Sequence, residues 1–167
     1  HMNIGSGATD IRTRAFFGCS NLVAITVDPL NLSYTSLDGV FFNKSQTELI
    51  QYPAKKTGRY VVPDGVVIIH PDAFDTAINL TSVGLPASLT SIGDSGFFGC
   101  SALTSIVIPA SVTQIQDYTF ADCVRLTSIT VGNSVTEIGS YAFSGCIRVT
   151  GVTFGTGLVS IGESAFS

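Results

Sequence analysis

A block of 23 residues recurs along this chain, and a fixed period of this length predicts a solenoid. The blocks that share its columns are 7–29, 65–87, 88–110, 111–133 and 134–156, and 157–167 begins a further one. The last three complete blocks follow one another without a gap. Because one block cannot bury its apolar residues alone, stacking of successive blocks is expected to build one continuous core.

Apolar residues occupy the same columns in every block. One column is phenylalanine throughout: Phe16, Phe74, Phe97, Phe120, Phe143 and Phe166. A later pattern of the type Leu103-x-x-Ile106-x-Ile108 predicts a short strand with alternate side chains pointing inward. The strands are expected to lie parallel in one concave sheet that contains residues near 24–27, 82–85, 105–108, 128–131 and 151–154.

This period predicts a β-rich α/β solenoid with a right-handed path, parallel strands and short turn, 3-10 or helical segments. A single domain is expected over residues 7–167. Residues 1–6 are interpreted as a short lead-in, of which His1-Met2 resembles a cloning remnant. The chain opens and stops within the repeat pattern, so we expect a fragment of a longer protein whose C-terminal end is frayed or covered.

Charge argues against two classes of partner. Only 12% of the residues are charged, against roughly 25% in ordinary proteins, and the net charge is −4. A weakly charged, slightly acidic surface is unsuited to nucleic acid or to anionic membranes. No apolar run approaches the ~20 residues that span a bilayer, and no signal peptide is recognised. Neither a nucleic-acid partner nor membrane insertion is therefore expected.

The cysteines share one column of the repeat. Cys19, Cys100, Cys123 and Cys146 occupy it, and Ala77 replaces them in the remaining complete block. Because alanine is accepted there, we predict buried, reduced thiols that act as small apolar groups. Disulfides between neighbouring blocks are an alternative, although parallel Cβ vectors suit their geometry poorly. A metal site lacks a Cys-x-x-Cys motif or a histidine nearby.

Residues 30–64 interrupt the period. Two apolar runs around the sequence NKSQT predict a β-hairpin of Val40–Phe42 and Glu48–Tyr52, after an Asp38-Gly39 turn. Four of the eight basic residues lie in this segment, at Lys44, Lys55, Lys56 and Arg59. Two interpretations stay open: a protruding recognition hairpin, or a solvated insertion whose lysines protect strand edges.

The repeat columns resemble those of a known family. The stretches IGSYAFSGCIRVTGVTF and IGDSGFFGCSALTSIVIP are similar to the repeat of the BspA-like leucine-rich repeat family of bacterial and protozoan surface proteins. The resemblance covers residues 7–167 and includes the irregular segment. It implies a leucine-rich-repeat superhelix on a cell-surface or secreted protein, used in adhesion to host proteins or other cells. It supplies no catalytic residues.

The sequence contains no recognised catalytic, cofactor-binding or metal-binding motif. His70 stands at a variable position and is predicted to be exposed. Aspartates near the phenylalanine column suggest either an acidic stripe that holds Ca²⁺ or, without a calcium-loop motif, solvated turns. These aspartates are Asp72, Asp75, Asp94, Asp117 and Asp122. Asn31, Asn43 and Asn79 match glycosylation sequons, which are weak evidence in a chain rich in serine and threonine.

The outward positions of the strands are the candidate binding residues. They are Thr81, Ser82, Thr104, Ser105, Val107, Thr127, Ser128, Thr130, Thr150 and Thr153. Such a surface offers area and hydrogen bonds without a pocket. The alternative is that β-branched threonine is simply a favourable residue in exposed strands. The first hypothesis is a non-catalytic module that binds a host or cell-surface protein, or a glycan. The alternative is a spacer or stalk that holds another domain away from the cell surface.

Overall fold

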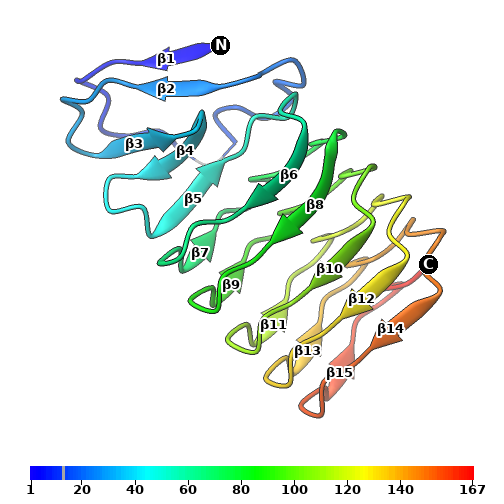
Figure 1. The fold of residues 1–167 in the computed structure, drawn as a ribbon. Coiled ribbons are helices and arrows are strands. Elements are labelled where there is room, and N and C mark those ends of the chain that lie inside the picture. Colours follow the sequence, from blue (N-terminus) through cyan, green and yellow to red (C-terminus); the bar gives the residue numbers. More distant parts are fainter. Residues whose placement is uncertain (13) are drawn as a thin grey trace.

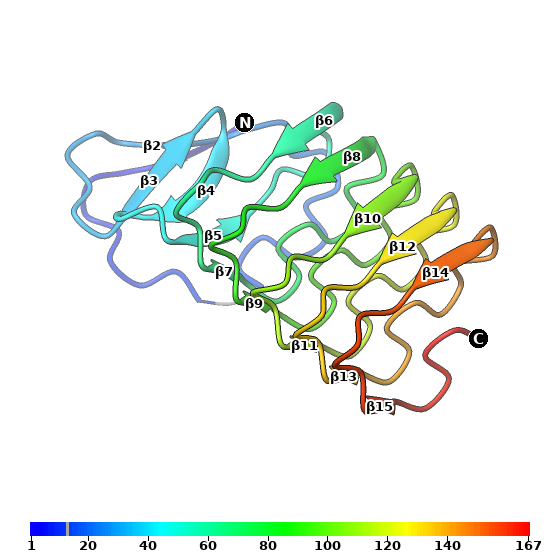
Figure 2. The same ribbon diagram turned by 60° about the horizontal axis from the view of Figure 1, so that its bottom comes forward.

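The computed structural model describes residues 1–12 and 14–167, which form a β-solenoid whose coils stack side by side (Figures 1 and 2). Its strands are β1 (Met2–Ile4), β2 (Ile25–Val27), β3 (Tyr34–Leu37), β4 (Val40–Asn43), β5 (Glu48–Gln51), β6 (Gly58–Val61), β7 (Ile68–Ile69), β8 (Leu80–Gly84), β9 (Ser91–Ile92), β10 (Ser105–Val107), β11 (Gln114–Ile115), β12 (Ser128–Thr130), β13 (Glu137–Ile138), β14 (Gly151–Thr153) and β15 (Ser160–Ile161). Each 23-residue block after residue 64 contributes two strands joined by turns.

Each coil has three sides. The outward surface of β6, β8, β10, β12 and β14 is called here the strand face. The short strands β7, β9, β11, β13 and β15 form the second side. The third, called here the turn side, consists of the turns at 70–77, 93–100, 116–123 and 139–146, together with 14–19. The pairings between neighbouring coils are parallel, so equivalent residues of successive blocks lie next to each other.

The turn side contains no helix among the described residues, so the expected α/β character and helical segments were wrong. Each turn places two residues, four positions apart, in the left-handed region, as at Ser95 (φ 55°) and Gly99 (φ 67°). A right-handed helix cannot pass through such residues. The amide groups instead bond the next coil: the Phe74 amide donates to the Gly96 carbonyl at 2.8 Å, and the Thr76 amide donates to the Phe98 carbonyl at 2.8 Å.

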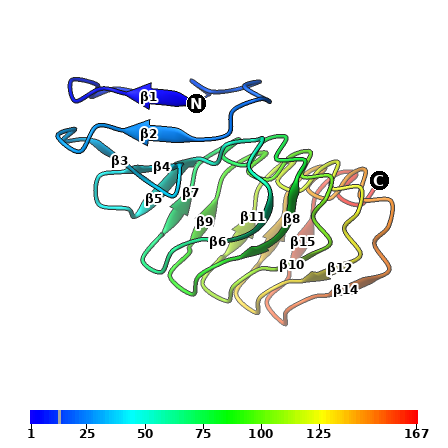
Figure 3. The same ribbon diagram turned by 45° about the horizontal axis from the view of Figure 1, so that its top comes forward.

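The single concave sheet was predicted correctly only in part. Strands β10, β12 and β14 form one parallel sheet, and β8 lies beside β10 with the Thr104 amide donating to the Thr81 carbonyl. Strand β2 does not join them: it pairs with β1 at the N-terminal end (Figure 3). Leaving the lead-in out of the fold was therefore also wrong, since Met2 itself pairs with Ile25.

The irregular segment contains the predicted hairpin together with two further strands, β3 and β6. Strands β3, β4 and β5 form an antiparallel meander, with a bulge at Ile50 of β5, which lies opposite the step from Phe41 to Phe42 in β4. Asp38 (φ 50°) and Gly39 (φ 75°) both have positive φ, as the type I′ turn of a two-residue hairpin requires. Strand β5 then pairs in parallel with β7, and β6 pairs in parallel with β8. The segment therefore completes an extra, shortened coil of the solenoid.

This segment is part of the core, so neither a protruding hairpin nor a solvated insertion describes it. Val40, Phe42 and Leu49 are fully buried in the main hydrophobic cluster. Tyr52 is buried too, and its ring stacks on Phe74 with centroids 4.8 Å apart. Two of the three lysines make polar contacts: the Lys44 ammonium donates to the Asn31 carbonyl, and the Lys56 ammonium donates to the Asp38 carboxylate.

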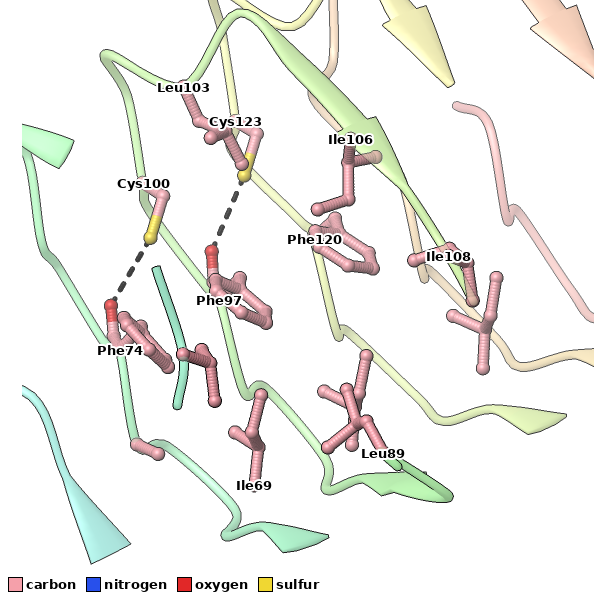
Figure 4. Packing of buried hydrophobic residues seen from close by; sticks show 14 of the residues in the cluster. Ile69, Phe74, Leu89, Phe97, Cys100, Leu103, Ile106, Ile108, Phe120 and Cys123 are labelled. Atoms are coloured by element: carbon pink, nitrogen blue, oxygen red, sulfur yellow. Dashed lines mark hydrogen bonds between the residues drawn. The ribbon is translucent and has the colours of Figure 1, made fainter. Parts of the chain in front are cut away.

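The phenylalanine column forms a stack along the solenoid axis (Figure 4). Ring centroids are 4.5 Å apart for Phe74–Phe97 and 5.2 Å apart for Phe97–Phe120, and the planes are within 15° of parallel. The stack continues through Phe143 to Phe166 in the last coil, where β15 pairs with β13 and where Ile161 and Phe166 are 49% and 40% exposed. Phe16 leaves the stack, because it packs edge-on against Phe41 in a second, smaller cluster.

The four thiols are free, as predicted, but only two are fully buried. The Cys123 thiol donates to the Phe97 carbonyl of the preceding coil at 3.3 Å, and Cys100 repeats this contact (Figure 4). Cys146 is half-buried and Cys19 is exposed, so the prediction of burial was wrong for Cys19 and incomplete for Cys146. Cys19 belongs to the first block, which is separated from the main stack and packs in the smaller cluster.

We expect thiol reactivity to follow this burial. Ellman's reagent should titrate one thiol quickly in the native protein, that of Cys19, and four after unfolding without reductant. Burial raises the pKa of Cys146 to about 12, which leaves little reactive thiolate at neutral pH. A Cys19→Ser variant, used as the control, should lose the fast phase alone. Fewer than four thiols in the unfolded wild type would contradict the free-thiol assignment.

Candidate interaction surface

The strand face consists of rows of side chains that the parallel register aligns. Ser105 lies opposite Ser128, and Val107 lies opposite Thr130, which in turn lies opposite Thr153. Between these rows Ile106 and Ile129 point inward and are buried, and the equivalent Val83 and Val152 are half-buried against the same core. Since side chains alternate along a strand, burial of the isoleucine row forces its neighbours outward. The predicted binding residues are therefore brought together on one surface, with Thr81, Thr104, Thr127 and Thr150 at its margin.

That threonine margin has a structural use that the sequence analysis missed. The Thr127 hydroxyl donates to the Thr104 carbonyl at 3.0 Å, and the Thr127 amide donates to the same oxygen at 2.9 Å. The Thr104 and Thr150 hydroxyls each donate in the same way to the threonine of the preceding coil, at 3.4 Å. Because these three hydroxyl protons are already used, Thr104, Thr127 and Thr150 can offer a partner only their oxygen lone pairs.

The inner rows differ from the margin in this respect. Within the described part of the chain, the hydroxyls of Ser105, Ser128, Thr130 and Thr153 make no hydrogen bond to other protein groups. All four side chains are exposed. Each hydroxyl can therefore both donate to and accept from a partner. The inner rows therefore have more unused hydrogen-bonding capacity than the threonine margin.

Two further residues belong to this face and were not among the predicted ones. Strand β6 places Arg59 opposite Ser82 and Val61 opposite Gly84, so both rows extend by one coil. Val61 is 57% exposed and Val107 is 63% exposed. Only Gly84 lies between them in this row, so the two valines form a small apolar patch in a surface otherwise rich in hydroxyl groups. The sequence YVVP, which matches the strand pattern, was the signal that could have found them.

The other candidate residues have structural partners. His70 is half-buried rather than exposed, and its Nε2 lies 2.8 Å from Oε2 of Glu48 on the neighbouring coil. Asn31 is fully buried: its amide donates to the carbonyls of Gly5 and Ala8, and its side-chain oxygen accepts from two backbone amides. A buried, fully bonded amide cannot accept a glycan in the folded chain, so this sequon is not a surface site.

The turn-side aspartates do not form one solvated group. Asp72 and Asp75 are buried, which contradicts the expectation of solvated turns for these two. Asp72 accepts hydrogen bonds from the Arg14 guanidinium, the closer at 2.7 Å, and this contact raises the pKa of Arg14. Asp117 accepts from the Ser140 amide at 2.7 Å. No group of three or more potential metal ligands occurs within residues 1–12 and 14–167.

Three hollows of the described chain lie away from the strand face. They are lined by residues between positions 1 and 98, and no strand-face residue is among these linings. Helices of the length and apolarity that cross a bilayer are absent from the described residues. The surface best suited to a macromolecule is therefore the strand face, whereas a small hollow on the turn side is suited to a single side chain.

Several solved structures share this fold. The pneumococcal vaccine antigen PcpA aligns with a TM-score of 0.89 at 22% identity, over 99% of this chain and 43% of that one. A leucine-rich repeat protein from Eubacterium ventriosum aligns with a TM-score of 0.79 at 23% identity, over 99% and 57% of the two chains. A leucine rich cell surface protein from Faecalibacterium prausnitzii aligns with a TM-score of 0.73 at 33% identity, over 92% and 47%.

This chain thus spans about half the length of the solved structures that it matches. No match was found among curated proteins. The profile of the BspA type leucine-rich repeat region matches in six copies over residues 1–60 and 54–167. These matches include the irregular segment, in agreement with its extra coil. Since the profile accounts for the whole repeat array, the chain belongs to the BspA type leucine-rich repeat family.

Proposed function

We propose that this chain is a non-catalytic module that binds a partner protein through its strand face. The observation that carries the proposal is the pair of exposed rows across β6 to β14, in which the inner hydroxyls have no partner within the described residues while the threonine margin is already bonded. An extended surface of stacked repeats is the usual binding surface of solenoid proteins.

A protein partner suits the mixed chemistry of this face. Val61 and Val107 offer exposed apolar surface, whose burial is the main driving force of most protein association. The unpaired hydroxyls of Ser105, Ser128 and Thr130 can then satisfy polar groups around that apolar patch. Because the face carries one charged side chain, Arg59, binding is expected to depend only weakly on salt.

The solved structures of similar fold support a location at the cell surface. One is described as a vaccine antigen and another as a cell surface protein. By analogy with them, we place this chain on a cell-surface or secreted protein, with a host or cell-surface protein as the partner. The analogy concerns the class of protein and leaves the partner to be identified by experiment.

The test is a binding screen followed by a charge insertion. The chain should be screened against immobilised extracellular-matrix and cell-surface proteins, with a glycan array as the comparison. For a protein that binds, Thr130→Arg should weaken the affinity at least about tenfold, because it places a bulky charge in the middle of the exposed rows. Surface-plasmon resonance measures the change.

Thr113→Arg is the matched control, since Thr113 is exposed just before β11 on a different side of the coil. It should leave the affinity and the melting temperature unchanged. Equal binding by the two variants would move the site away from the strand face. Binding to glycans alone would replace the protein partner by a glycan, and no binding in either screen would favour the spacer.

A further inference from the structure

A hollow of about 170 Å³ opens on the turn side, between the first block and the coils that follow the irregular segment. It is lined by Arg14, Phe17, Asp72, Asp75, Ser95 and Phe98. These residues come from only two columns of the repeat, occupied by residues 14, 72 and 95 and by residues 17, 75 and 98. The hollow is therefore built by equivalent positions of successive turns.

The same two columns look different farther along the solenoid. The first column holds Tyr118 and Tyr141, whose rings stack with centroids 5.0 Å apart and planes 6° from parallel. The second column holds Ala121 and Ser144. In these later coils neither column contains a charged residue that could pair with a charged ligand. Within these two columns, charged groups are thus gathered at one place, although every coil has the same backbone plan.

One carboxylate in the hollow is already neutralised. The Arg14 Nε donates to Oδ2 of Asp72 at 2.7 Å, and the guanidinium lies over the Phe17 ring, 5.5 Å from its centroid. The arrangement combines an ion pair with a cation–π contact. Phe17 is 59% exposed, so the outer surface of this arrangement faces solvent.

The second carboxylate, that of Asp75, has no such cation. The residue is 7% exposed and lines the hollow, and no described residue donates a hydrogen bond to its carboxylate. The neighbouring Thr76 hydroxyl donates to the Asp75 main-chain carbonyl at 2.8 Å. Burial raises the pKa of the Asp75 carboxyl, and the Asp72 charge adds to this, against smaller opposite effects of Thr76 and Arg14. A mostly buried carboxylate that lines a hollow and has no hydrogen-bond donor among the described residues can accept hydrogen bonds from a cation with N–H groups.

We propose that this hollow binds one cationic side chain, lysine or arginine, of a partner protein. The ammonium or guanidinium group donates to the Asp75 carboxylate, and the aliphatic part of the side chain packs between the rings of Phe17 and Phe98. Arg14 makes the same combination of contacts with Asp72 and Phe17 inside this chain. The site lies on the turn side, so it goes beyond the strand-face function and does not depend on it.

A titration followed by NMR tests the site with small probes. Nα-acetyl-arginine methylamide and Nα-acetyl-lysine methylamide are added to the labelled chain at neutral pH and low salt. Saturable shifts are expected at the amides of Phe17, Asp75, Ser95 and Phe98. The neutral analogue Nα-acetyl-citrulline methylamide should shift these signals at least about tenfold more weakly, because it retains the shape and loses the charge. Calcium chloride is added in a separate titration.

Asp75→Asn should weaken binding of the cationic probes at least about tenfold and leave the melting temperature unchanged or higher, because it removes a buried charge without changing shape. Asp122→Asn, at an exposed turn position, is the matched control and should bind like the wild type. Thr130→Arg, on the strand face, should also leave this titration unchanged, which separates the two proposals. Four results would each overturn the proposal. In the wild type they are the absence of saturable shifts, equal shifts with the citrulline probe, and tighter binding of Ca²⁺ at the same amides. In the variant it is full binding of the cationic probes by a folded Asp75→Asn protein.

Discussion

Replacing Phe120 with alanine is expected to lower the free energy of unfolding by about 3–5 kcal/mol. Phe120 is fully buried, and its ring stacks on both neighbours, with centroids 5.2 Å from Phe97 and 5.2 Å from Phe143. The variant loses the transfer free energy of the ring and two aromatic contacts, and the stack above and below cannot close the cavity without moving a coil. Urea unfolding followed by far-ultraviolet circular dichroism measures the change, since the chain has no tryptophan.

Cys123→Ala is the matched control in the same coil. It removes one buried sulfur and its hydrogen bond to the Phe97 carbonyl, so a loss of about 1 kcal/mol is expected. The Phe97 carbonyl keeps a bond from the Cys100 amide at 3.3 Å, and Ala77 already fills this column in another coil. A loss as large as that of Phe120→Ala would mean that the thiol, rather than the phenylalanine stack, holds the coils together.

The second large effect is expected in the irregular segment, where Phe42→Ala should also cost about 3–5 kcal/mol. Phe42 in β4 is fully buried in the main cluster and pairs with Leu49 of β5, which continues into the parallel strands of the solenoid. Its loss leaves a cavity between the meander and the repeats. Thermal and urea unfolding of the purified variant give the change in midpoint and in free energy.

Leu37→Ala tests the same meander at a surface position. Leu37 in β3 is 45% exposed, so its replacement should cost less than about 1 kcal/mol. A solvated insertion would tolerate both substitutions equally well. A mild effect of Phe42→Ala, comparable with that of Leu37→Ala, would therefore restore that interpretation and contradict the burial described here.

These losses of stability also concern the shape of the strand face, which is the proposed binding surface. The rows of the strand face stay aligned only while the coils remain stacked, because each residue of a row comes from a different coil. The phenylalanine stack and the threonine hydroxyls that bond the preceding coil both maintain that register. Variants that loosen the stack are therefore expected to weaken binding indirectly, and the surface substitution Thr130→Arg is the cleaner test of recognition.

The sequence alone determined the repeating part of this protein. A strict period means that each residue lies next to its own equivalent one coil away, so the Phe97–Phe120 stack and the pairing of Ser105 with Ser128 follow from column position. The Asp38-Gly39 turn was predictable for a local reason, since both residues tolerate positive φ. Membership of the BspA type family was recognisable from the same columns.

Tertiary structure decided whatever breaks the period. The prediction of helical segments failed because two residues with left-handed φ interrupt each turn. Several of these residues are not glycine, such as Tyr118, so their positive φ could not be predicted from the sequence. Cys19 and Cys123 share a column, yet only Cys123 is enclosed on both sides by coils, because the first block packs in a separate cluster with Phe41. Arg14 meets Asp72 across 58 residues of sequence because the intervening segment folds inward as a coil of its own. A period specifies only contacts between equivalent neighbours, whereas the path of an irregular segment depends on which apolar surfaces it can bury, and that is settled only in the folded chain.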